Sequence, residues 1–179
     1  MEGDWAGAVP WCVTGSGKQV LPLRMDDDLE AAAASLALDE LGADPRVDRC
    51  RIYAVGFSSA GYAAWRLAET HSERLAAIVP LAGGAWKDPK CPARRIPVWA
   101  FHGARDSVTP LEMSTDMADA FRACGSPVRL TIDPEADHGG ILAALESREL
   151  YRWLLAQRLE RCPEAPAADR VGTRHSNLP

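Results

Sequence analysis

The sequence predicts a single α/β domain in which a mostly parallel sheet carries helices on both faces. Strand and helix patterns alternate from about residue 25 onward. The strand patterns are continuous apolar runs, which is typical of parallel strands buried on both sides. Such alternation favours right-handed crossovers between neighbouring strands. We therefore expect functional residues at the carboxyl ends of the strands, where sites form in sheets of this kind.

Four strands and four helices are predicted in turn. The strands cover Arg51–Ser58, Ala76–Gly83, Ile96–Gly103 and Val128–Asp133. The helices cover Asp26–Leu41, Ser59–Thr70, the stretch from Thr109 to Gly125, and Arg148–Glu160. Acids open the first helix, whose Leu36 we expect to face inward with other apolar residues. The third helix begins with a capping-box pattern, Thr109 to Glu112, with Pro110 as its first helical residue.

The ends of the chain carry weaker patterns. Residues 1–25 suggest one remnant strand, around Ala8–Thr14, and are otherwise hard to interpret. Residues 163–179 lack periodicity, so we expect a disordered tail. Residues 1–162 are then one domain, which is an ordinary size for a single core.

Composition excludes several functional classes. The 179 residues are 47% hydrophobic and 25% charged, with a net charge of −5. This balance gives no reason to expect nucleic acid or an anionic membrane surface as a partner. No apolar run approaches the length of a membrane span. The first residues, MEGDWAGAVPW, lack the basic and apolar regions of a signal peptide, so we expect the cytoplasm.

The cysteines predict neither a disulfide framework nor a zinc site. The chain has five, at Cys12, Cys50, Cys91, Cys124 and Cys162. Their number is odd and no pair has CxxC spacing. We expect most of them to be small apolar residues of the core.

The segment VGFSSAGYAAW, residues 55–65, places Ser58 where a predicted strand meets a predicted helix. Gly56, Ala60 and Gly61 surround it. A serine on a sharp strand-to-helix turn exposes its hydroxyl and needs small neighbours. The first N–H groups of the following helix favour negative charge that develops nearby. The alternative is a glycine-rich turn that only brings a helix close to a strand.

An acid and a histidine follow the next strand ends. Asp106 lies in FHGARDSVTP, after the third predicted strand, and His138 lies in PEADHGG, after the fourth. Serine is a weak nucleophile unless an imidazole takes its proton and a carboxylate orients that imidazole. The chain order Ser58, Asp106, His138 suits this arrangement on an α/β sheet.

Other candidates fit these roles less well. His102 lies within the strand end, where we expect packing or a hydrogen bond to the backbone. His71 follows the helix on the far side, and His175 is in the tail. Asp137 adjoins His138 and so points elsewhere, while Asp133 ends the last strand.

At these residues the chain resembles the α/β-hydrolase superfamily. It is most similar to a bacterial carboxylesterase or "predicted peptidase" group related to polyhydroxybutyrate depolymerases, feruloyl esterases and dienelactone hydrolases. The similar segments are DRCRIYAVGFSSAGYAAWRLAETHSERLAAIVPLAGG, IPVWAFHGARDSVTP and ADHGG with SRELYRWLLAQR, within about residues 47 to 158. The resemblance implies Ser58 as nucleophile, Asp106 as acid, His138 as base, and the Ser59 N–H as an oxyanion donor.

The chain departs from this family in two ways. Ala60 stands where the elbow usually has glycine. Only about 50 residues precede the elbow strand, so the family's first strands and its HG-type oxyanion loop are missing. Losing one oxyanion donor costs about 2.7–4 kcal/mol. The missing neighbour also leaves an apolar edge. We expect a homodimer through that edge, cover from the N-terminal segment, or a truncated gene product.

The predicted function is a serine carboxylic-ester hydrolase that needs no metal or organic cofactor. A small-molecule ester is the expected partner. The loop around residues 85–95 is short, which favours small or soluble esters, and Trp86 lines the substrate pocket or packs at its rim. A truncated, non-catalytic binding module and a serine peptidase or acyltransferase remain as alternatives.

Overall fold

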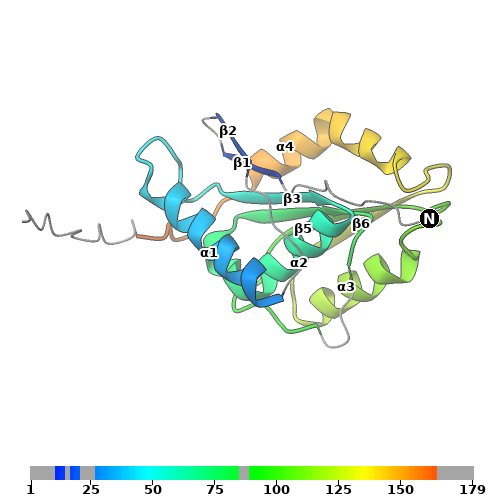
Figure 1. Ribbon diagram of the computed structural model, residues 1–179, viewed down its shortest axis with the longest axis horizontal. Coiled ribbons are helices and arrows are strands. Elements are labelled where there is room, and N and C mark those ends of the chain that lie inside the picture. The colour runs from blue at the N-terminus through cyan, green and yellow to red at the C-terminus, as the bar shows by residue number, and fades with distance from the viewer. Residues whose placement is uncertain (1–10, 15–16, 21–26, 85–88, 165–179) are drawn as a thin grey trace, which may run out of the picture.

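The computed structural model describes residues 11–14, 17–20, 27–84 and 89–164. One mixed sheet lies between two layers of helices (Figure 1). Its strands are β1 (Trp11–Thr14), β2 (Gly17–Val20), β3 (Tyr53–Phe57), β4 (Ala77–Leu81), β5 (Val98–Gly103) and β6 (Val128–Asp133). They are arranged in the order β2-β1-β3-β4-β5-β6. The strands β3 to β6 are parallel, as the apolar runs predict.

Four α-helices connect or follow the strands. They are α1 (Asp27–Ala43), α2 (Ser59–His71), α3 (Leu111–Ala123) and α4 (Arg148–Ala156). Two 3₁₀-helices, η1 (Ser72–Arg74) and η2 (Gly140–Glu146), were not expected from the sequence. Each predicted strand and helix is present, but α4 ends at Ala156 rather than Glu160 because Gln157 turns extended.

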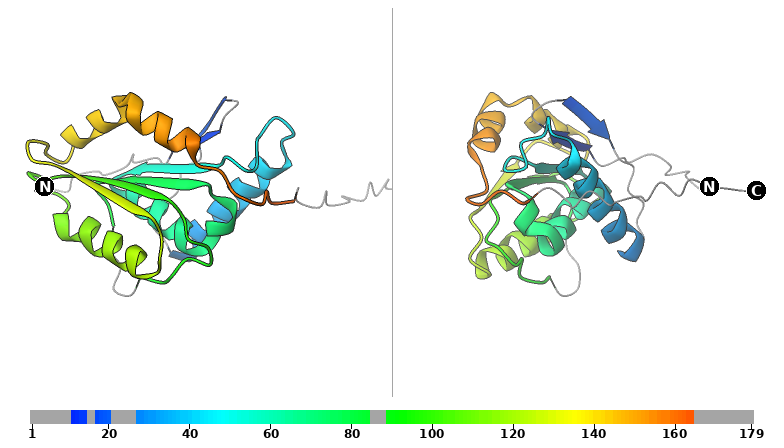
Figure 2. Two further views of the ribbon diagram at one scale, coloured as in Figure 1. Left: turned by 180° about the vertical axis from the view of Figure 1, so that it is seen from behind. Right: turned by 90° about the vertical axis from the view of Figure 1, so that its left-hand side faces the viewer.

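Helices cover both faces of the sheet, and each face has its own apolar core. Figure 2 shows α4 on one side and α1, α2 and α3 on the other. Neighbouring strand residues therefore point into opposite cores, as Ile78 and Val79 do. Burial on both faces explains why these strands read as continuous apolar runs. None of the helices in the described ranges has the length and hydropathy to span a bilayer.

The first two strands form an antiparallel hairpin beside β3. Trp11 pairs with Val55, and Val13 pairs with Tyr53. The expected remnant strand is thus present over its described residues, and it covers the edge of β3. The hydrogen-bonding groups of β3 are satisfied within the chain on this side. The homodimer through this side of the sheet stays a prediction.

Two local expectations were wrong. Leu36 of α1 is 66% exposed, whereas Leu41, which was expected on the same inward side, is buried together with Leu38, so the inward face is rotated from the predicted one. The capping box at Thr109 does not form either. Pro110 is the N-cap of α3, and no side chain caps this helix end.

The prediction that the cysteines form no disulfides was wrong. Cys50 is bonded to Cys162, and Cys91 is bonded to Cys124. The first disulfide joins the residues before β3 to the segment after α4, with 4.7 Å between the two Cα atoms. The second joins the loop after β4 to the end of α3, with a Cα separation of 5.5 Å. Cysteine spacing along the chain does not reveal such pairs, because each bond spans 33 or more residues.

The disulfide between Cys91 and Cys124 should stabilise the fold measurably. We expect the double variant Cys91→Ser/Cys124→Ser to lose about 2–4 kcal/mol of unfolding free energy, since the bond restricts the unfolded chain. Urea unfolding would measure this, with Cys12→Ser in both proteins so that the fifth cysteine cannot exchange. Equal urea midpoints for the two proteins would show that the bond does not form.

Candidate active site

Ser58 lies at the sharp turn between β3 and α2. Its backbone has φ 56° and ψ −119°, a conformation that L-residues rarely adopt. Holding such a residue costs about 1–3 kcal/mol. The turn is fixed from both sides, because the Ser58 N–H donates to the Leu81 carbonyl at 2.8 Å and its own carbonyl accepts from Tyr62 N–H at 3.1 Å. The side chain is thereby held at the end of the sheet.

Small residues make this turn possible. A Cβ at Gly56 would overlap the Ala60 carbonyl, and a Cβ at Gly83 would overlap the Ser58 carbonyl. A Cβ at Gly61 would lie 2.8 Å from the Leu81 oxygen. The helix α2 thus packs directly onto β3 and β4. Ala60, the residue that departs from the family's usual glycine, is 5% exposed and fits beside this turn.

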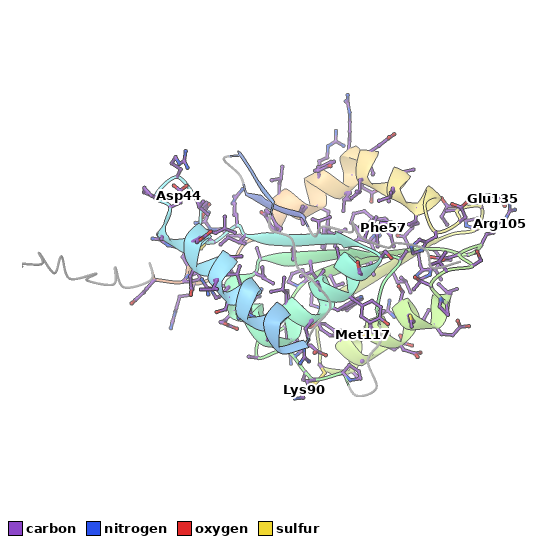
Figure 3. All side chains as sticks on the ribbon, viewed as in Figure 1. Asp44, Phe57, Lys90, Arg105, Met117 and Glu135 are labelled. Carbon is purple, nitrogen blue, oxygen red and sulfur yellow. A yellow bond between two sulfur atoms is a disulfide. The ribbon has the colours of Figure 1, made fainter. Side chains whose placement is uncertain are left out.

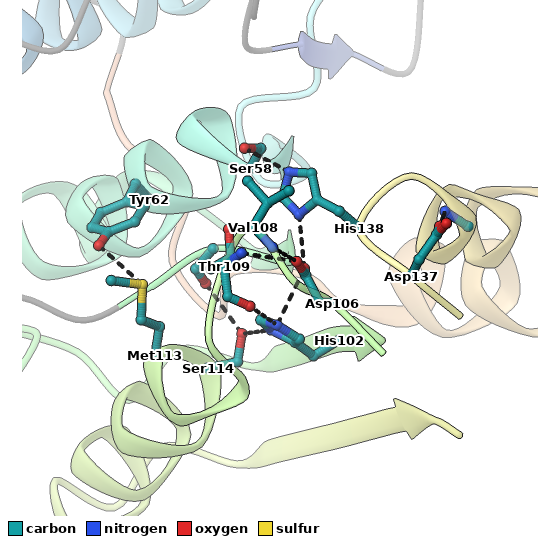
Figure 4. Close-up of polar contacts among 12 residues, drawn as sticks. Ser58, Tyr62, His102, Asp106, Val108, Thr109, Met113, Ser114, Asp137 and His138 are labelled. Carbon is teal, nitrogen blue, oxygen red and sulfur yellow. Dashed lines mark hydrogen bonds and ion pairs between the residues drawn. The ribbon is translucent and has the colours of Figure 1, made fainter. Parts of the chain in front are cut away.

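The three residues singled out in the sequence form a continuous hydrogen-bonded chain (Figure 4). His138 Nε2 lies 3.1 Å from Ser58 Oγ, and His138 Nδ1 lies 2.7 Å from Asp106 Oδ2. A carboxylate accepts, so Nδ1 carries a proton and Nε2 accepts from the serine hydroxyl. The His138 side chain is 19% exposed, whereas that of Asp106 is fully shielded. This arrangement can remove the hydroxyl proton and stabilise the resulting imidazolium.

Asp106 is held as a carboxylate. Burial by itself raises its pKa, but hydrogen bonds from Thr109 N–H, His138 and Val108 N–H outweigh this effect, so the pKa lies below its usual value. The two backbone N–H groups donate to Oδ1 at 2.8 and 2.9 Å. Oδ2 lies 2.7 Å from His138 Nδ1 and 3.4 Å from His102 Nε2. The two carboxylate oxygens therefore contact different groups, backbone N–H groups at Oδ1 and imidazoles at Oδ2.

The loops after β5 and β6 are tied together, which sets the spacing between acid and histidine. Arg105 N–H donates to the Ala136 carbonyl at 3.0 Å, and Ala104 N–H donates to the Asp133 carbonyl at 2.8 Å. Arg105 and Glu135 form an exposed ion pair on the same loops (Figure 3). Asp106 and His138 therefore share one rigid support.

The rival residues have other partners. Asp137 accepts from Gly140 N–H at 2.7 Å within its own turn. Asp133 accepts from two N–H groups of the loop that follows it. His71 lies 2.7 Å from Thr70 Oγ1 at the far end of α2. His102 is hydrogen-bonded to the Thr109 backbone carbonyl, as expected, and lies close to Asp106. His175 is outside the described residues.

Two further residues predicted for the site are Ser59 and Trp86. Ser59 is the first residue of α2, where backbone N–H groups have no acceptor within the helix. Trp86 lies outside the described residues. The ring of Phe57, which precedes the serine, packs with its centroid 4.8 Å from that of His138. The sequence did not predict this contact.

One group in the described residues has the composition of a metal site. The ligand atoms of Asp48, Cys50 and Cys162 lie within 4.8 Å of one another. The two cysteines form a disulfide, which leaves no thiolate to bind a cation.

Comparison with known proteins identifies the family. The model of the dienelactone hydrolase family matches residues 12–149, so the chain belongs to this family. A curated relative described as "Putative esterase NocK", from Nocardia uniformis subsp. tsuyamanensis, is 35% identical over 113 residues. This match covers 62% of the chain and 33% of the relative. The chain thus spans about a third of that protein.

Solved structures share the fold. A thermostable esterase superposes with a TM-score of 0.63 at 28% identity, covering 77% of this chain and 38% of the esterase. A single-residue variant of SOBER1 from Arabidopsis thaliana gives 0.62 at 16% identity, covering 84% of this chain and 80% of that protein. The acylaminoacyl peptidase of Pyrococcus horikoshii gives 0.58 at 15%, with 76% and 29% covered. The chain has the α/β-hydrolase fold.

The strained backbone conformation of Ser58 should lower the stability of the fold. We expect Ser58→Gly to be more stable than Ser58→Ala by about 1 kcal/mol, because glycine adopts a positive φ without strain. Both variants lack the hydroxyl, so thermal or urea unfolding compares backbone strain alone. A Ser58→Ala variant as stable as Ser58→Gly would show that the turn is relaxed.

Proposed function

We propose that this chain hydrolyses carboxylic esters through an acyl-enzyme on Ser58. The observation that carries the proposal is the hydrogen-bonded chain from Ser58 through His138 to Asp106, at the ends of three parallel strands. Membership of the dienelactone hydrolase family supports a hydrolase of this type. The 28% identical thermostable esterase supports the ester as the bond that is cleaved.

Each residue has a distinct role in the proposed reaction. Ser58 Oγ attacks the ester carbonyl while His138 Nε2 takes its proton. Asp106 keeps Nδ1 protonated and stabilises the imidazolium. The Ser59 N–H donates to the developing oxyanion at the N-terminus of α2. The imidazolium then protonates the departing alcohol, and a water activated by His138 releases the acid. Neither a metal nor an organic cofactor takes part in these steps.

Small or soluble esters are the proposed substrates. Ser58 and Tyr62 are half-buried, and Val108, beside the acid, is 59% exposed. From this exposure we infer that the described residues around the serine leave the site open and partly apolar. Such a site suits short acyl groups better than long lipid chains.

A non-catalytic binding module is the second candidate, and one observation favours it. The strand beside β3 is the antiparallel β1, and the HG-type oxyanion loop that the resemblance predicts ahead of the elbow strand is absent from the sequence. A single donor at Ser59 would stabilise the oxyanion less than two. A serine peptidase would use the same three residues to cleave an amide instead of an ester. An acyltransferase would use them to pass the acyl group to an acceptor other than water.

Ester and amide substrates test the activity. We expect p-nitrophenyl acetate and butyrate to be hydrolysed with a burst of p-nitrophenol, and Ser58→Ala to abolish it. Asp106→Asn should reduce kcat by about 10⁴-fold, because the imidazole loses its tautomer. Cys12→Ser is the matched control and should keep full activity. Comparable turnover of peptide anilides would favour a peptidase.

Unchanged ester hydrolysis in Ser58→Ala would contradict the assignment. A wild-type protein that folds but shows no turnover and no burst would favour the binding module.

The compartment is a separate proposal. The first residues of the sequence predict the cytoplasm, but the two disulfides favour an oxidising compartment, because cytosolic reductants keep thiols reduced. We expect protein from an oxidising compartment of an expression host to alkylate only at Cys12 and to unfold at higher urea than reduced protein. Full alkylation of native protein at Cys50 and Cys91 would instead favour the cytoplasm as the compartment.

A further inference from the structure

His102 is a buried histidine for which the proposed reaction has no use. It lies on β5, four residues before Asp106, and its side chain is fully shielded from solvent. Its Nε2 is 2.9 Å from the Thr109 carbonyl and 3.4 Å from Asp106 Oδ2. Its Nδ1 is 2.7 Å from Ser114 Oγ on α3. The imidazole therefore joins β5, the acid's loop and α3 (Figure 4).

The hydrogen bonds of His102 run to two different elements. The Thr109 carbonyl only accepts, so His102 Nε2 donates to it. On the other side of the ring, Nδ1 lies 2.7 Å from Ser114 Oγ. The Ser114 hydroxyl in turn donates to the Gly83 carbonyl at 3.3 Å, which also accepts from Trp65 Nε1 at 3.1 Å. Both ring nitrogens of this buried imidazole therefore have partners.

The Asp106 carboxylate lies between two imidazoles. Among the described residues, it is the ionisable group within ion-pair distance of His102, and His138 lies on its other side. The carboxylate accepts three hydrogen bonds, from His138, Val108 and Thr109. His102 is therefore packed against the carboxylate that contacts His138.

We propose that His102 is a positioning residue, which Ser114 holds from α3 and which fixes the loop that carries Asp106. This proposal rests on the proposed function, since it concerns the geometry of that acid. Thr109 is the link, because its N–H donates to Asp106 Oδ1 and its carbonyl accepts from His102. Fixing both polar groups of Thr109 fixes the direction in which Oδ2 faces His138.

The same contacts reach the nucleophile. Ser114 Oγ lies 3.3 Å from the carbonyl of Gly83, and a Cβ on Gly83 would overlap the Ser58 carbonyl. Through Ser114, α3 is therefore connected to His102 on one side and, on the other, to the Gly83 backbone that packs against Ser58. Loss of His102 should loosen the spacing between Asp106 and His138 without removing any reacting atom.

Two substitutions of His102 separate positioning from packing. The amide nitrogen of His102→Gln can replace Nε2 as a donor to Thr109, whereas His102→Phe fills the space without a donor. We expect His102→Phe to lower kcat by about 10²-fold with KM nearly unchanged, since small misplacements cost this much. His102→Gln should restore most of kcat.

The hydrogen bond between His138 and Asp106 can be followed without relying on activity. The His138 Nδ1 proton, hydrogen-bonded to a carboxylate at 2.7 Å, should give a downfield ¹H NMR signal in the wild-type protein. We expect His102→Phe to shift or weaken this signal and His102→Gln to keep it. An unchanged signal in folded His102→Phe would overturn the proposal, and so would a His102→Gln variant as impaired as His102→Phe. Absent ester turnover in the wild type would instead defeat the proposed function and leave the NMR result standing.

Discussion

The close approach of α2 to the sheet at Ser58 is the constraint on which the rest of the site depends. The turn holds a strained serine, and it exists because Gly56, Gly61 and Gly83 leave room for backbone against backbone. The strain is balanced by hydrogen bonds at both sides of the serine. Once this turn is set, the hydroxyl lies at the carboxyl end of the strands, within reach of the loops that follow β5 and β6.

Those loops act as one support for the acid and the histidine. Backbone hydrogen bonds between them fix their spacing, and the buried contacts of His102 and Ser114 connect them to α3. The Asp106 carboxylate is shielded from solvent yet remains charged, because its hydrogen bonds outweigh the effect of burial on its pKa. A charged acid next to a partly exposed histidine is the electrostatic arrangement that base catalysis by His138 requires.

Much of this arrangement was predictable from local patterns. The parallel strands, the helices and the positions of Ser58, Asp106 and His138 follow from apolar runs and from residues at strand ends, which depend on neighbours in sequence. The disulfides and the contact between His102 and Ser114 join segments far apart in the chain, so no local pattern shows them. Leu36 was misplaced for a related reason, since the inward face of α1 depends on what packs against it.

The N-terminal hairpin was only partly predictable. A strand near Trp11 was expected, but its antiparallel pairing with β3 depends on contacts across the sheet. The chain spans about a third of its curated relative, and the strand beside the elbow strand is the short antiparallel β1. The completeness of the oxyanion site is therefore the point on which the proposed activity depends.

Labelling with a fluorophosphonate, read by intact mass and peptide mapping, tests the central claim most directly. Such a reagent reacts with a serine whose hydroxyl is activated by a base and whose oxyanion is stabilised. The account predicts one adduct, on Ser58, that is lost in His138→Ala. No adduct on well-folded protein, or an adduct that persists in His138→Ala, would contradict it.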